Sequence, residues 1–98
     1  MNLSELMIRI RENPSQFLQD DCIFQLRAFL RGFIFAKNTS ANLTTKDHQL
    51  LDSIDSKIKS LYGIKEGEII SIEEILDDNE KENAFSKYLE QWFRYAQH

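Results

Sequence analysis

A chain of 98 residues with no long stretch rich in Pro, Gly or Ser predicts one domain, and its apolar content of 42% suffices for a single core. Three glycines and one proline favour a helical protein, and the net charge of −4 argues against direct binding of nucleic acid or of an anionic membrane. The single cysteine, Cys22, excludes an intramolecular disulfide and a cysteine-based metal site, which predicts a reducing, cytoplasmic location.

The first segment predicts a helix over about residues 3–12, because apolar residues recur there at helical spacing: Leu3, Leu6, Met7 and Ile10. Ser4 or Asn2 can cap the start of this helix, and Asn13 with Pro14 should end it. Charged residues lie among the apolar ones, which is not typical of a signal peptide.

Residues 22–36 form the most apolar run of the chain and predict a central helix that is buried on nearly all sides. One face and its flanks are apolar: Cys22, Ile23, Leu26, Ala28, Phe29, Leu30, Phe33, Ile34 and Phe35. We expect the first helix, a helix over residues 46–62 and the last helix to contact this run. Arg27 and Arg31 should mark its wet edge and argue against a membrane span, and Gly32 suggests that another helix approaches closely.

The middle of the chain predicts a loop, a helix and a connector. Residues 38–45 are polar and should form the main loop. An amphipathic helix over about 46–62 follows and ends at Gly63. Residues 64–70 then form a connector without a clear period.

Two capping boxes predict the remaining helices. Ser71 with Glu74 should open a short helix, and Asn79 with Glu82 should open the last one. The last helix carries a wide apolar stripe: Ala84, Phe85, Tyr88, Leu89, Trp92, Phe93 and Ala96. Of the neighbouring aromatic residues near its end, we expect Tyr95 to be exposed or interfacial. The sequence therefore predicts an all-α fold, a single domain over residues 1–98 with about five helices around the run 22–36.

No motif in the sequence supports catalysis, so we expect a protein that is not an enzyme and holds no cofactor or metal. His48 and His98 are isolated, and no glycine-rich phosphate loop or calcium-binding loop occurs. The arginines Arg9, Arg11, Arg27 and Arg31 could form an anion site, but pairing on a helix surface with Glu12, Asp52 or Asp55 is the favoured interpretation.

The segment from residue 66 to residue 82 has a net charge of −7, with eight acidic side chains against one lysine: Glu66, Glu68, Glu73, Glu74, Asp77, Asp78, Glu80 and Glu82. A charge run usually means a solvated face. Here the charge is confined to short, capped elements, which also suits binding of a basic protein partner. We take these eight residues as the candidate partner-binding site.

The order of features resembles a family of small bacterial immunity proteins that accompany contact-dependent growth-inhibition and polymorphic toxins. The resemblance covers most of the chain and rests on apolar fold positions. They are Ile8 with Ile10, Asn13-Pro14, Phe17-Leu18, the segment LRAFLRGFIFA (26–36), Leu61 to Ile64, Ser71-Ile72 with Ile75-Leu76, and Ala84-Phe85 with the aromatic residues up to Tyr95. Ile72 stands where this family has a tryptophan.

The resemblance implies a cytoplasmic, non-enzymatic inhibitor that binds one cognate toxin domain, often a nuclease. We expect the protein to be a monomer in that complex, without contact to nucleic acid or membrane. The alternative hypothesis is a helical adaptor or regulatory module whose acidic face binds another basic protein.

Overall fold

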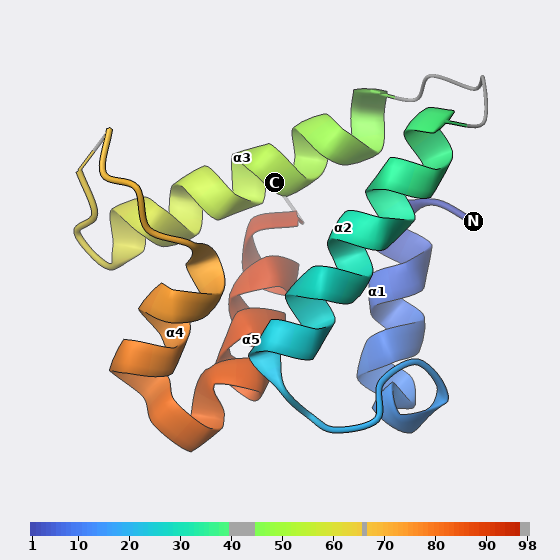
Figure 1. The fold of residues 1–98 in the computed structure, drawn as a ribbon, viewed down its shortest axis with the longest axis horizontal. Helices are drawn as coiled ribbons and strands as arrows, with labels where there is room; N and C mark the ends of the chain where they lie inside the picture. The colour runs from blue at the N-terminus through green and yellow to red at the C-terminus, as the bar shows by residue number, and fades with distance from the viewer. Residues whose placement is uncertain (40–44, 66, 97–98) are drawn as a thin grey trace.

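The computed structural model describes residues 1–39, 45–65 and 67–96, and every regular element within these ranges is a helix (Figure 1). The elements in chain order are α1 (Leu3–Glu12), η1 (Pro14–Gln16), α2 (Ile23–Thr39), α3 (Thr45–Leu61), α4 (Ile72–Glu80), η2 (Lys81–Asn83) and α5 (Ala84–Ala96), where η denotes a short 3₁₀ turn. The predicted all-α class is confirmed. The radius of gyration, 13.2 Å, is that of one compact body of this length.

The first helix begins and ends where the sequence predicts. Asn2, not Ser4, is the cap, because the Asn2 side chain accepts a hydrogen bond from the Glu5 backbone N–H at 2.8 Å. After α1, Pro14 occupies the first position of η1, where its missing N–H costs nothing.

The connection between α2 and α3 is shorter than the predicted loop over residues 38–45. α2 continues to Thr39 and α3 already begins at Thr45; residues 40–44 lie outside the described ranges. α3 ends as predicted, because Gly63 adopts a φ of 74°, a conformation that favours glycine, and the Ile64 N–H donates to the Lys59 carbonyl at 2.9 Å.

Only one of the two predicted capping boxes forms. The Ser71 hydroxyl accepts from the Glu74 N–H at 3.2 Å and opens α4. The box predicted for Asn79 and Glu82 is wrong, because α4 continues through Asn79 to Glu80. The Asn79 side chain instead donates to the Ile75 carbonyl at 2.7 Å, within the last turns of α4. α5 therefore begins later, at Ala84, after η2.

The predicted all-round burial of the central helix is wrong, although its inner face is fully buried at Leu26 and Leu30. Phe24 is 44% and Phe35 69% exposed, and Phe29 is only half-buried. The physical reason is that α2 packs mainly against α3, α4 and α5, while α1 makes no comparably extensive contact with it, and this packing leaves Phe24 and Phe35 uncovered. Close approach at Gly32 is also not found, since no described atom lies within 4 Å of a β-carbon placed there.

α5 contributes the largest fully buried side chains, Tyr88 and Trp92. Tyr95, expected to be exposed or interfacial, is half-buried, and the Lys57 ammonium lies 5.9 Å from its ring centroid. Phe93 is half-buried beneath the Arg11 guanidinium, 4.0 Å from the ring centroid, which joins α1 to α5. None of the described helices is long and apolar enough to cross a membrane.

Candidate functional site

Four exposed carboxylates lie together in sequence on α4 and η2: Glu74, Asp77, Asp78 and Glu82. We call this set the acidic surface. Helix geometry explains the three on α4, because a rotation of about 100° per residue places positions 74, 77 and 78 on one outward arc. The opposite arc carries Ile72, Ile75 and Leu76, which are buried. In Figure 1, α4 (orange) lies at the side of the molecule away from α1 (blue).

The acidic surface has no ion pair with any other described residue. Glu74 accepts a hydrogen bond from the Ser71 hydroxyl at 3.0 Å, which completes the capping box and fixes the first turn of α4. Because Asp77, Asp78 and Glu82 keep their carboxylates in solvent, their full charge is available to a basic partner.

The charge of the acidic surface is poorly placed for the stability of α4 itself. Asp77 and Asp78 occupy the C-terminal half of the helix, whose last turn contains no basic residue. The helix dipole disfavours negative charge at that end by about 0.3–1 kcal/mol for each side chain. In addition, Lys81 closes α4 with a φ of 54°, which is strained for a residue with a side chain.

The acidic surface leaves out four of the eight predicted site residues: Glu66, Glu68, Glu73 and Glu80. Glu68 is exposed on the connector, where it accepts the Lys65 backbone N–H at 3.1 Å. Glu80 is half-buried and accepts the Tyr62 hydroxyl at 2.8 Å. Burial, followed by the hydrogen bond to Glu80, raises the pKa of Tyr62, so its hydroxyl stays a donor. Glu66 is outside the described residues.

Glu73 is not on the surface, which corrects the prediction of one continuous acidic face. Only 6% of the surface of Glu73 is exposed. Its carboxylate pairs with Arg31 and lies 3.5 Å from the Arg27 Nε atom. Helix geometry places position 73 at the edge of the buried arc of α4, between Leu76 and Asp77, and packing buries it there, so its charge requires cationic partners. We therefore leave Glu73 out of the acidic surface.

Arg27 is the centre of a buried polar cluster that sequence analysis missed. Its guanidinium donates to both carboxylate oxygens of Asp55 at 3.0 and 2.9 Å and to the Tyr88 hydroxyl at 3.0 Å. With Glu73 and Arg31 these residues form what we call the Arg27 cluster, which joins α2, α3, α4 and α5. Asp55 is one of the three carboxylates that the sequence suggested as partners of the arginines, but the predicted position of Arg27 at a wet edge is wrong, because Arg27 is 6% exposed.

The charge states of Arg27, Asp55 and Glu73 follow from this geometry. Burial alone would lower the pKa of Arg27, but Tyr88 and Asp55 outweigh it and the pKa is raised. Burial also raises the pKa of Asp55, although Arg27 opposes the shift. We regard the pair as ionised at neutral pH, because both Asp55 oxygens accept hydrogen bonds from the guanidinium. Burial would raise the pKa of Glu73 too, but hydrogen bonds from its own backbone and from Arg31 leave it lowered.

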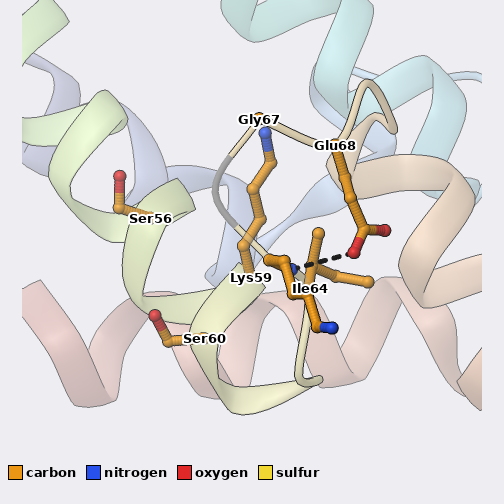
Figure 2. A pocket seen from close by; sticks show the side chains of 7 residues that line it. Ser56, Lys59, Ser60, Ile64, Gly67 and Glu68 are labelled. Carbon is orange, nitrogen blue, oxygen red and sulfur yellow. Dashed lines mark hydrogen bonds between the residues drawn. The ribbon is translucent and has the colours of Figure 1, made fainter.

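A pocket of about 410 Å³ lies between the last turns of α3 and the connector that leads to α4 (Figure 2). It is lined by hydroxyl, ammonium, carboxylate and apolar groups: Ser56, Lys59, Ser60, Ile64, Lys65, Gly67 and Glu68. The dashed line in Figure 2 is the bond from the Lys65 N–H to Glu68. The lining shows no nucleophile held by a base, so we assign no reaction to this pocket.

His48 is not isolated in the structure, because a carboxylate lies beside its ring. It is exposed on the first turns of α3, where its Nε2 lies 3.3 Å from a carboxylate oxygen of Asp52, four residues along the helix. Among the described side chains, no group of three His, Cys, Asp or Glu could hold a metal ion. His98 is outside the described ranges.

Comparisons with family models, with curated proteins and with solved structures gave no significant match.

Proposed function

We propose that the protein is a non-enzymatic inhibitor that binds a cognate antibacterial toxin domain and covers its basic, substrate-binding region with the acidic surface. The observation that carries this proposal is the set of exposed carboxylates on α4 and η2 that form no ion pair with any other described residue. Their identification with toxin inhibition rests on the resemblance to immunity proteins.

The chemistry of a nuclease toxin suits this surface. A nuclease must attract phosphate groups, so its active-site region carries arginine and lysine side chains. Carboxylates fixed on a helix can make charge-assisted hydrogen bonds to those side chains where phosphates would otherwise lie. Opposite charge also accelerates the association of the two proteins. The proposal includes a cytoplasmic location and a monomeric inhibitor in the complex.

The unfavourable charge at the end of α4 supports a role in binding. Asp77 and Asp78 oppose the helix dipole and gain no compensating ion pair from the described residues. A basic partner would supply that compensation. Functional surfaces commonly retain such locally destabilising residues.

The direct test is co-expression of the tagged protein with the product of the reading frame immediately upstream of its gene. We expect that product to be toxic alone, to be harmless when co-expressed, and to co-purify with the tagged protein. A non-toxic upstream product would contradict the inhibitor proposal. In that case, capture of a different basic protein would favour the adaptor hypothesis.

A further inference from the structure

The Arg27 cluster ties α4 to the rest of the bundle through one buried carboxylate. Glu73 pairs with Arg31 at the edge of α2 and lies 3.5 Å from Arg27, which itself holds Asp55 on α3 and Tyr88 on α5. α4 also packs on α2, α3 and α5 through apolar side chains. The ion pairs differ from these apolar contacts because they are directional.

α4 depends on such contacts for its orientation. It has nine residues, and an isolated helix of that length is not stable in water. Its apolar residues Ile72, Ile75 and Leu76 form a broad arc. Hydrophobic packing alone could keep this arc buried even if α4 were rotated about its own axis. Glu73 widens the buried arc to one side, so its pairing with the two arginines selects a single rotation.

The cluster is not built for maximal stability. Glu73 Oε1 and Arg27 Nε are buried and have no hydrogen-bond partner among the described residues. Replacing buried ion pairs with apolar residues of similar volume is often neutral or stabilising, so the pairing by itself is weak support for a stabilising role. An interaction that is directional and contributes little to the global free energy of unfolding is suited to fixing the local orientation of one helix.

We infer that Glu73 is a positioning residue: held by Arg27 and Arg31, it fixes the rotation of α4 and so directs Glu74, Asp77 and Asp78 together toward the partner. The role of this orientation in partner binding rests on the proposed function. It deepens that proposal, because it names a contact that orients the acidic surface without itself touching the partner.

The test uses a double variant, Arg31→Met/Glu73→Met, which removes one positive and one negative charge and leaves Arg27 paired with Asp55 and Tyr88. The matched control is Arg94→Gln/Glu90→Gln, which removes an exposed pair on α5 whose atoms lie 3.7 Å apart. Amide hydrogen exchange is measured on each free protein, so this part of the test requires no partner.

We expect the amides of α4 in the double variant to exchange at least about tenfold faster than in the wild type, while the amides of α5 are unchanged. The control should leave both helices unchanged. Unchanged exchange in α4 would overturn the inference. Equally faster exchange in every helix would also overturn it, because it would show a general structural role. If the double variant does not fold, Glu73→Gln is measured against the same criteria.

Binding to the upstream gene product gives a second readout. We expect the double variant to dissociate about tenfold faster while its association rate and salt dependence stay those of the wild type, since the acidic surface keeps its charge. Unchanged dissociation would overturn the inference. If the wild type itself does not bind, the proposed function fails, whereas the exchange measurement still decides whether Glu73 fixes α4.

Discussion

Arg27 is a charged side chain that is buried because it has partners on several helices. It donates three hydrogen bonds to Asp55 and Tyr88, so its desolvation is compensated within the bundle. The nearby Arg31 carries the same charge, but its side chain is 52% exposed. The two arginines, four residues apart, should therefore respond differently to replacement.

Arg27→Met should lower the free energy of unfolding by about 3–5 kcal/mol, because it leaves Asp55 buried without its cation. Arg31→Met should cost clearly less, since water can replace the exposed guanidinium and Arg27 remains beside Glu73. Urea denaturation of both variants provides the comparison. Equal losses of unfolding free energy for the two variants would contradict the expectation that the buried Arg27 matters more for stability than the exposed Arg31.

Glu73 should make the free energy of unfolding depend on pH in the acidic range. Its pKa is lowered in the folded protein, so its contribution is fully present above the unfolded pKa of about 4.3 and is lost as the pH falls through the folded value. Glu73→Gln should therefore flatten the pH dependence of the unfolding free energy below about pH 4.3. Parallel curves for the wild type and the variant over that range would refute this expectation.

At the scale of elements, α4 combines a well-formed start with a strained end. Ser71 and Glu74 cap its first turn, as the sequence predicts. Its last turn has exposed acidic residues, and Lys81 adopts a positive φ. Sequence could not predict this end, because the Asn79–Glu82 spacing fits a capping box equally well.

Lys81→Gly should raise the free energy of unfolding by about 1 kcal/mol, because glycine adopts a positive φ without a steric cost. Lys81→Ala removes the same positive charge but keeps the strain, so it should not stabilise the protein. Thermal denaturation of the two variants separates backbone strain from charge. Equal melting temperatures of the two variants would rule out backbone strain at Lys81 as a cause of lost stability.

α2 shows where an apolar sequence pattern gives an incomplete prediction. Leu26 and Leu30 are fully buried, as expected, yet Phe24 and Phe35 are largely exposed. Composition indicated that α2 would be buried, but it could not show which of its side chains α3, α4 and α5 would leave uncovered. For the same reason, the inward position of Arg27 was missed: its partner Asp55 is distant in sequence.

At the scale of the whole molecule, the helical class and the starts of α1 and α4 follow from local sequence, because caps and apolar periodicity are local signals. The candidate site was only partly predictable. Charge counts identified the acidic segment, but they treated Glu73 like Glu74. The two differ because one residue of rotation on α4 moves a carboxylate from solvent to the interior.

The central claim is that the acidic surface binds a basic partner, and the affinity for the upstream gene product at several salt concentrations tests it most directly. Three proteins are compared: the wild type, Asp77→Asn/Asp78→Asn, and the control Glu5→Gln/Glu12→Gln. The control changes the net charge equally at exposed positions on α1.

We predict that the α4 variant binds at least about tenfold more weakly and with a smaller salt dependence, while its melting temperature is unchanged or raised, because negative charge has left the C-terminal half of α4. The α1 variant should bind like the wild type. Equal affinities and equal salt dependences for all three proteins would contradict the claim and show that the acidic surface is only a solvated face.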